Sequence, residues 1–271
     1  LTRDAGVSVG YHPRYSPDGQ AIAFISDRNG QNNLWIMDSD GSNPRAVVED
    51  QATKFFEPTW TPDGDYIVVR KARRSTTPGS PGQSGIWMYH RDGGSGIELV
   101  ATGDESGAAW PSVSQDGRYL YFHVSRSPFM ASTRDATSGS WQVRRKDLES
   151  GLVISITSGE AQQQGRASSG GGYAAEVDPS GRYVAFVRRI PNGTISFKGH
   201  QFGPRSALWL RDLATGTERV VMDPIEQDMA EGMKTLRIVP GYDWTPDGGA
   251  IVLSQGGQIR RVDVGTGDVT T

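Results

Sequence analysis

The residues of this sequence best suited to hold a metal or to move a proton near neutral pH are its histidines. They are His12, His90, His123 and His200, and each falls at a different place in a repeated pattern. The motifs His-Glu-x-x-His, the phosphate-binding P-loop and the Gly-x-Ser-x-Gly nucleophile elbow do not occur. Cysteine is absent, which excludes disulfides and thiolate catalysis. We therefore predict no catalytic, metal-binding or cofactor-binding residue, and surface or interblade positions for the histidines.

Aspartates spaced along the chain resemble a set of catalytic carboxylates, but their neighbours indicate another role. Asp18, Asp63 and Asp247 each stand in the tetrapeptide Ser/Thr-Pro-Asp-Gly, and Asp116 stands in Ser-Gln-Asp-Gly. A fifth variant, Asp-Pro-Ser-Gly, occupies 178–181. Proline presets the φ of a tight turn, and glycine takes the left-handed position at its end. These aspartates are therefore predicted to be turn residues.

The turns imply short strands on either side of them. The predicted second strands are 22–25, 67–69, 120–122, 184–187 and 251–253, and the third strands are 34–37, 86–89, 141–143, 208–210 and 259–262. A further short strand closes each unit. Brief runs rich in β-branched and aromatic residues are typical of sheets. The sequence thus contains five copies of a four-stranded unit.

Five such units in one order predict an all-β fold, a β-propeller of four-stranded antiparallel blades. A β-sandwich would explain many strands, but not a turn and a strand pattern repeated in the same order. The predicted blades are about 11–49, 56–101, 109–157, 173–222 and 241–271, within a single domain over 1–271. Residues 1–4 are interpreted as a lone outer strand, so a truncated sixth blade is left open.

Composition excludes several classes of protein. The 271 residues include 35 glycines, nearly twice the ordinary share, which disfavours a helical bundle. The net charge of −3 argues against general binding of nucleic acid. No apolar run approaches the roughly 20 residues that cross a bilayer, so no membrane span is expected. No signal-peptide pattern is present either, as in a mature secreted protein.

Several segments resemble a known propeller repeat. Residues 13–19 (Pro-Arg-Tyr-Ser-Pro-Asp-Gly), 22–24 (Ile-Ala-Phe) and 34–38 (Leu-Trp-Ile-Met-Asp) resemble the TolB-type PD40 repeat, which is WD40-like. The stretch 222–261 is similar to the N-terminal propeller of large bacterial amidohydrolases. That resemblance implies a metal-dependent hydrolase barrel as partner, which this sequence does not contain, and a periplasmic or secreted location.

Aligning the first strands on their turns places five polar residues at one position. They are Arg14, Thr59, Ser112, Glu176 and Asp243. Strand alternation separates them from their apolar neighbours, and first strands are innermost in a propeller, so these residues should ring the central channel. A water-filled channel with an ion pair of Arg14 is the expected state. An ion or small polar ligand bound there is the alternative.

The long segments between strands all fall on one face of a propeller. Loops on a rigid scaffold often carry recognition, and here they are rich in basic residues. The candidate partner face contains Arg70, Lys71, Arg73, Arg74, Arg188, Arg189, Lys198, Arg205, Met229 and Met233. The two methionines share one side of a predicted short helix after Pro224, a pattern that more often packs into a core. A protein partner, or the missing hydrolase domain, is expected to dock on this long-loop face.

Three functions follow from these observations. The first is a non-catalytic TolB-like propeller for protein–protein or interdomain interaction, serving as the accessory domain of an amidohydrolase. The alternative is a free-standing periplasmic TolB-like binding protein. A second alternative is a lyase or hydrolase that uses the channel. The chain itself has no catalytic motif, although its parent protein would be a hydrolase under the first hypothesis.

Overall fold

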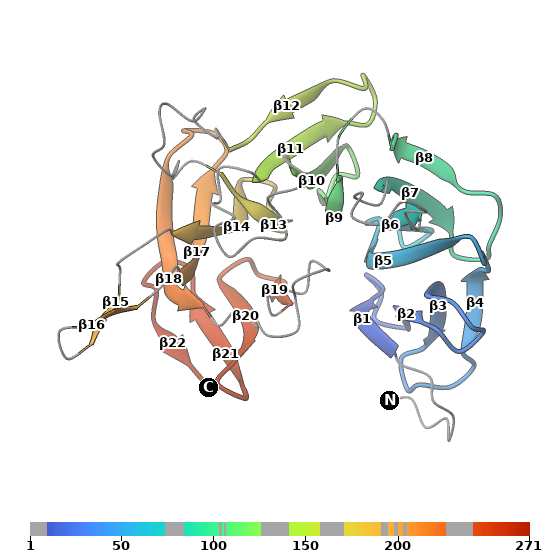
Figure 1. Cartoon of the computed structure of the whole chain (residues 1–271), viewed down its shortest axis with the longest axis horizontal. Coiled ribbons are helices and arrows are strands. Elements are labelled where there is room, and N and C mark those ends of the chain that lie inside the picture. The colour runs from blue at the N-terminus through green and yellow to red at the C-terminus, as the bar shows by residue number, and fades with distance from the viewer. Residues whose placement is uncertain are drawn as a thin grey trace. The chain divides into compact units, whose positions relative to one another are not determined.

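The structure is a computed structural model that describes residues 10–73, 84–102, 105, 107–125, 141–157, 171–190, 195–197, 200–202, 205–225 and 241–271. Every helix or strand element in these residues is a β-strand (Figure 1). The chain forms two compact units, Leu1–Leu120 with Lys146–Leu152 and Tyr121–Arg145 with Val153–Thr271. Across the described ranges no helix is long and apolar enough to cross a membrane.

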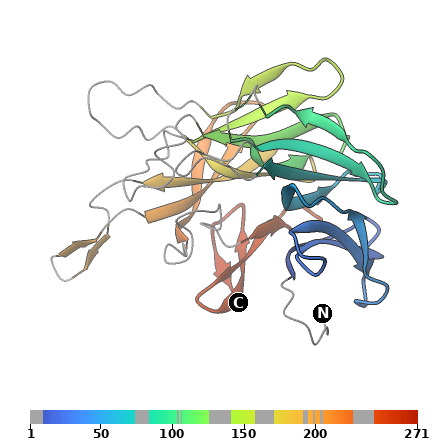
Figure 2. The same cartoon turned by 45° about the vertical axis from the view of Figure 1, so that its right-hand side comes forward.

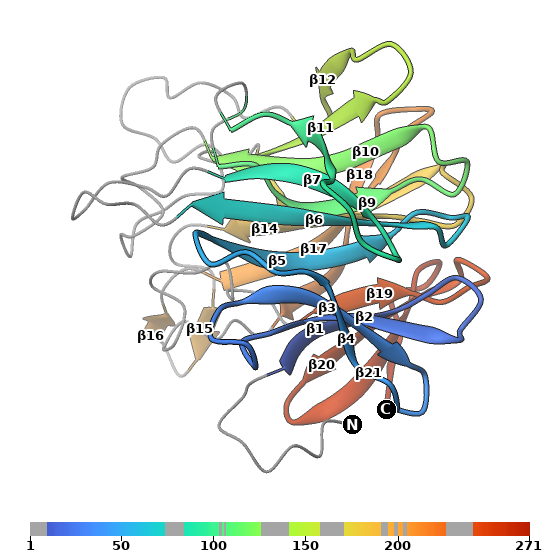
Figure 3. The same cartoon turned by 90° about the vertical axis from the view of Figure 1, so that its right-hand side faces the viewer.

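The first unit contains two complete four-stranded sheets. The first has the order β1 (Gly10–Tyr15), β2 (Ala21–Ser26), β3 (Asn33–Asp38) and β4 (Arg45–Val48). The second has the order β5 (Thr53–Trp60), β6 (Tyr66–Arg73), β7 (Ser84–His90) and β8 (Ile97–Val100). Adjacent strands are antiparallel in both sheets. Figure 3 shows the two sheets stacked on each other as neighbouring blades.

The remaining sheets repeat this order. The third consists of β9 (Ala109–Val113), β10 (Tyr119–Ser125), β11 (Trp141–Asp147) and β12 (Val153–Ser155). The fourth consists of β13 (Tyr173–Val177), β14 (Tyr183–Ile190), β17 (Arg205–Asp212) and β18 (Glu218–Ile225). The fifth consists of β19 (Tyr242–Trp244), β20 (Ala250–Gln255), β21 (Gln258–Asp263) and β22 (Val269–Thr270). A separate hairpin of β15 (Ile195–Phe197) and β16 (His200–Phe202) projects away from the fourth sheet (Figure 2).

Five four-stranded antiparallel blades make this protein a β-propeller, which confirms the predicted fold class. The strands nevertheless run further than the sequence predicted. β6 continues to Arg73, β14 continues to Ile190, and β17 begins at Arg205, all inside segments expected to be loops. The register stays regular there, with Arg188 opposite Ala207 and Ile190 opposite Arg205. Long basic side chains are compatible with a strand because their apolar stems can cover neighbouring rings.

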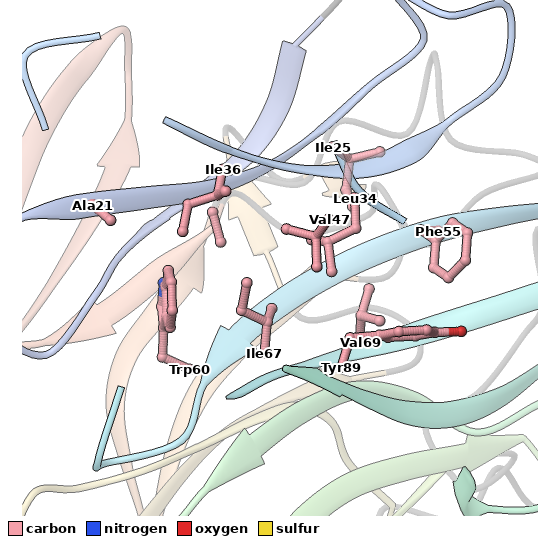
Figure 4. Close-up of a cluster of buried hydrophobic side chains, with 11 residues drawn as sticks. Ala21, Ile25, Leu34, Ile36, Val47, Phe55, Trp60, Ile67, Val69 and Tyr89 are labelled. Atoms are coloured by element: carbon pink, nitrogen blue, oxygen red, sulfur yellow. The ribbon is translucent and has the colours of Figure 1, made fainter. Parts of the chain in front are cut away.

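The core of the first unit lies between its two blades (Figure 4). The first blade contributes Ala21, Ala23, Ile25, Leu34, Ile36 and Val47, and the second contributes Phe55, Trp60, Ile67, Val69 and Tyr89. Alternate residues of each strand point to this side, so a register slip of one residue would move the whole apolar set away from the core. Phe55 and Tyr89 meet edge to face, with centroids 5.8 Å apart.

The turns between first and second strands share one hydrogen-bond network. In the first turn the Ser16 hydroxyl donates to Asp18 at 2.5 Å and accepts the N–H of Ala21. The same pairs recur as Thr61 with Asp63, Ser114 with Asp116 and Thr245 with Asp247. These hydroxyl hydrogen bonds hold the pKa of the four carboxyls below their ordinary value. The prediction of turn aspartates is confirmed.

The fourth turn keeps the network with its residue types exchanged. Here Asp178 stands first, accepts the hydroxyl proton of Ser180 and accepts the N–H of Tyr183 at 2.6 Å. A carboxylate at the first position thus replaces the hydroxyl that the other turns use. The irregular sequence at 178–181 therefore forms the same turn.

Candidate functional site

The five polar positions singled out from the sequence lie on the five first strands. For four of them, the register pairs with second strands are Arg14–Ala23, Thr59–Val68, Glu176–Ala185 and Asp243–Val252. Each of these pairs stands one place from the turn-side pair of its blade, so the predicted alignment holds in the structure. Ser112 and Glu176 are buried, and Asp243 is exposed. Arg14, Thr59 and Ser112 belong to the first compact unit, and Glu176 and Asp243 to the second.

A backbone bulge lies two residues before this position in four of the first strands. The bulge residues are His12, Glu57, Trp110 and Ala174, with φ between 52° and 55°. Left-handed φ is costly for residues other than glycine and persists only where the surroundings hold it. The register shifts at the same place in β1, β5 and β13. The bulge turns a backbone N–H away from the strand ladder, so that group needs another acceptor.

Neighbouring blades supply these acceptors in the first unit. The N–H of Glu57 donates to Nδ1 of His12 at 3.4 Å, and the N–H of Trp110 donates to Oε2 of Glu57 at 2.7 Å. Glu57 is only 7% exposed, and its other carboxylate oxygen lies 3.3 Å from Arg70. Three successive bulges are therefore linked by the side chains of His12 and Glu57, each of which accepts a hydrogen bond from a backbone N–H of the next bulge.

The second unit continues the pattern with a histidine from a second strand. The N–H of the bulge residue Ala174 donates to Nδ1 of His123 at 3.1 Å. His123 is 1% exposed, and its ring packs edge-on against Trp141 and Tyr173, with centroids 5.0 and 6.3 Å away. This histidine thus ties the third blade to the fourth.

Tryptophan makes a further interblade bond at two equivalent places. Nε1–H of Trp60 donates to the carbonyl of Arg14, and Nε1–H of Trp244 donates to the carbonyl of Glu176, both at 3.0 Å. Each acceptor is a polar position of the preceding blade. Tyr242 adds hydroxyl bonds to the carbonyls of Ala174 and Ala185. The first strands are thereby joined through their backbones as well as through their side chains.

Two basic residues of the candidate partner face are held by contacts within the second blade. Arg70 lies over the Phe56 ring, 4.3 Å from its centroid, in addition to its contact with Glu57. Lys71 lies 4.6 Å from the Trp87 centroid and 3.3 Å from a carboxylate oxygen of Asp50. Both cations therefore make intramolecular contacts with a carboxylate and an aromatic ring.

Arg188 is held in a similar way in the fourth blade. It is 6% exposed, lies 4.5 Å from the Trp209 centroid, and donates to Glu218 at 2.9 Å. It also donates to the carbonyl of Gly171 at 2.7 Å. Arg73 is exposed at the end of β6. The backbones of Arg189 and Arg205 lie in β14 and β17, whereas Arg74, Lys198, Met229 and Met233 lie outside the described residues.

The other histidines and the carboxylates give no sign of a metal centre in the described ranges. No three histidine or carboxylate side chains there are grouped as metal ligands. His90 is half-exposed at a turn, where its Nδ1 accepts the N–H of Asp92 at 3.2 Å. The side chains of His12, Glu57 and His123 each accept a hydrogen bond from a backbone N–H of a neighbouring blade.

The bulge residues are functional positions that the sequence analysis missed. A signal was available, because proline directly follows His12, Glu57 and Trp110 near the start of the first three predicted blades. Proline inside a strand marks an edge or a bulge. Ala174 carries no such mark, since Ala175 follows it, and only the structure identifies it.

Comparisons with known proteins agree with this geometry. The family model of the TolB β-propeller domain, PD40, matches residues 5–149, more than half of the chain. The uncharacterized peptidase YuxL of Bacillus subtilis is 31% identical over 153 residues, which are 46% of this chain and 22% of that protein. The uncharacterized protein Atu1656 of Agrobacterium fabrum is 28% identical over 174 residues, which are 64% of this chain and 48% of that protein. The chain thus spans between about a fifth and a half of the length of these relatives.

Solved structures show the same fold. The putative TolB from Agrobacterium tumefaciens matches with a TM-score of 0.66 and 17% identity over 98% of this chain and 81% of that one. An oligogalacturonate lyase in complex with manganese matches with a TM-score of 0.57 and 15% identity over 96% of this chain and 63% of that one. With the repeated blades, the shared turns and the match to the family model, the chain belongs to the TolB-type β-propeller domain family.

Proposed function

We propose that this chain is a non-catalytic TolB-like propeller that binds another protein domain, as the accessory domain of a larger hydrolase. Ile259 on β21 carries the proposal, because it is 71% exposed. The equivalent residues of the other four blades are at most 1% exposed. They are Leu34, Ile86, Val143 and Leu208. A β-branched apolar residue at a position that elsewhere packs against a neighbouring sheet supports docking of a further apolar surface on this face.

The register supports the same assignment. Ile259 pairs with Ser254, as Leu34 pairs with Ile25 in the first blade. Single exposed apolar residues are common on soluble proteins, so the position rather than the exposure is informative. Val252, on the same side of the sheet, is half-buried. A partner domain that covered this face would bury both residues.

The proposal that the chain is non-catalytic rests on polar side chains that form hydrogen bonds between blades. His12, Glu57 and His123 each accept a backbone proton between blades, which leaves them tied to structural roles. The hydrolase association is supported by YuxL, a relative described as a peptidase, in which the matched region is only part of the protein. A periplasmic or secreted location belongs to the same proposal, by likeness to the Tol-Pal system protein TolB of Anaeromyxobacter dehalogenans, which is 44% identical over 46 residues.

Two measurements test the proposal. A blot of source cells with an antibody against this chain should show a band far above 29.4 kDa if the propeller is part of a larger hydrolase. A band near that mass would favour the free-standing binding protein and would contradict the accessory role.

Docking is tested with a photo-crosslinking residue at position 259, compared with one at Leu152. Leu152 is a matched control because it is 64% exposed but lies next to the outer strand of another blade. We expect a crosslink to a second domain or protein from position 259 only. Equal crosslinking from both positions, or none from either, would count against the fifth blade as the docking face.

A further inference from the structure

We propose that two blade junctions are held by neutral histidines and loosen in mild acid, so that this propeller carries a built-in acid-sensitive coupling between blades. The junction between the third and fourth blades carries the stronger case, through His123 and the N–H of Ala174. The junction between the first and second blades has a longer bond of the same kind, from the N–H of Glu57 to His12.

The bond requires an unprotonated Nδ1. A histidine that accepts at Nδ1 carries its single ring proton on Nε2, whereas an imidazolium has a proton on both nitrogens and cannot accept. Protonation of His123 would set two N–H groups against each other at the 3.1 Å separation of the present bond. Because the imidazole is 1% exposed and lies between Trp141 and Tyr173, water has little access to replace the lost partner. The bulge at Ala174 would lose the contact that holds its left-handed backbone.

Two aromatic side chains contact the imidazole directly, and the strands packed against it also carry the charged residues Arg145 and Glu176. On β13, Tyr173 contacts the imidazole, and its hydroxyl lies 3.2 Å from that of Ser206. On β11, Trp141 contacts the ring, and Arg145 lies on the same face of the strand four residues later. Glu176 lies two residues beyond Ala174, and Tyr121 shares the His123 face of β10. The contacts described for the ring thus join it to aromatic groups and to one backbone N–H.

The junction between the second and third blades, which contains no histidine acceptor, supplies an internal comparison. There the acceptor is Glu57, which takes the N–H of Trp110 at 2.7 Å and is paired with Arg70. A carboxylate keeps its accepting oxygens down to about pH 4, whereas histidine ordinarily protonates near pH 6.5. Acidification from pH 7.5 to pH 5.5 should therefore weaken the junctions made by His123 and His12, whose acceptors are imidazole nitrogens.

The sign of the pH effect follows from linkage. If the folded protein resists protonation of His123, the unfolded chain binds more protons below about pH 6.5, and stability falls with falling pH in that window. The substitution His123→Asn should remove this dependence, because the amide oxygen of asparagine can occupy the place of Nδ1 without titrating.

The experiment measures amide hydrogen exchange of Ala174 at pH 7.5 and 5.5, corrected for the intrinsic pH dependence of exchange. We expect about tenfold faster exchange at pH 5.5 in the natural protein, which corresponds to about 1.4 kcal/mol. His123→Asn should show no such change, and the control His90→Asn, which removes a half-exposed histidine outside the junctions, should behave like the natural protein. Unchanged protection of Ala174 in the natural protein, or equal loss in His123→Asn, would overturn the proposal.

A measurement on the unaltered protein guards against a variant that fails to fold. An imidazole titration of the unaltered protein by NMR should show His123 still neutral at pH 6. If the His123 ring is already protonated at pH 6, the histidine coupling is wrong.

Discussion

In the first four blades, the two ends of the first strand are held by different kinds of hydrogen bond. At the turn end, a hydroxyl and a carboxylate two residues apart satisfy each other and the next strand, as in Ser16 and Asp18. At the bulge end, the N–H of Glu57 or Ala174 is satisfied by a side chain 45 or 51 residues away in sequence. The local network uses nearly the same residue types in every blade. The distant network uses histidine and glutamate to accept these N–H groups, and it uses tryptophan and tyrosine to donate to backbone carbonyls of a neighbouring blade.

The largest effect should come from the distant contacts of tryptophan. Trp60→Ala and Trp244→Ala should each destabilise the protein by about 3–5 kcal/mol, because each removes a buried ring and an interblade hydrogen bond. Trp60→Phe keeps most of the packing and should cost less. Chemical unfolding followed by near-UV circular dichroism measures these losses. If Trp60→Ala were milder than any turn variant, the ranking of distant over local contacts would be wrong.

Glu57 gives the next largest effect. Glu57→Ala should cost about 2–3 kcal/mol, because it leaves both the N–H of Trp110 and the guanidinium of Arg70 without their partner. Glu57→Gln retains an accepting oxygen for Trp110 and should recover about half of that loss. The same unfolding assay checks both variants. Equal destabilisation by alanine and glutamine would mean that the ion pair, and not the backbone bond, holds this junction.

A turn variant should have a smaller effect. Thr61→Val keeps the shape of the side chain but removes the hydroxyl that accepts the N–H of Tyr66 and donates to Asp63. We expect a loss of about 1 kcal/mol. Thr245→Val should match it, since the fifth turn has the same two bonds. A clear difference between these two variants in thermal unfolding would show that the turns are not equivalent.

The smallest effect should come from an ion pair on the third blade. A hydrogen bond from Arg118 holds the pKa of Asp147 at about 2, well below its ordinary value. Since the folded pKa is lowered, the stabilisation is complete above about pH 4 and is lost as the pH falls toward 2. Arg118→Gln should flatten stability in that range and raise the pKa of Asp147. The carboxyl titration by NMR measures this, with Asp212, which Arg182 pairs with in the fourth blade, as the internal reference.

The sequence predicted what depends on neighbours along the chain. The turns at Ser16 and Thr61 need a particular residue order within a few positions, so the repeat, the blades and the alignment of Arg14 with Glu176 could be read from it. The acceptors for Glu57 and Ala174 could not, because they depend on which strands meet in space. The basic residues Lys71 and Arg188 were interpreted as loop residues, although aromatic rings hold both of them on strands.

The bulges also protect this protein against aggregation through its edge strands. β1, β5, β9 and β13 are the first strands of their sheets, so no further strand pairs with their outer side in a ladder. Such an edge can recruit a strand from another molecule unless its ladder is interrupted. In three of these strands the bulge residue is followed by a proline, namely Pro13, Pro58 or Pro111. The proline has no N–H to offer a new strand, and the left-handed φ before it bends the edge. The backbone bulge that joins neighbouring blades therefore also makes the edges of these first strands poor templates for amyloid-like pairing between chains.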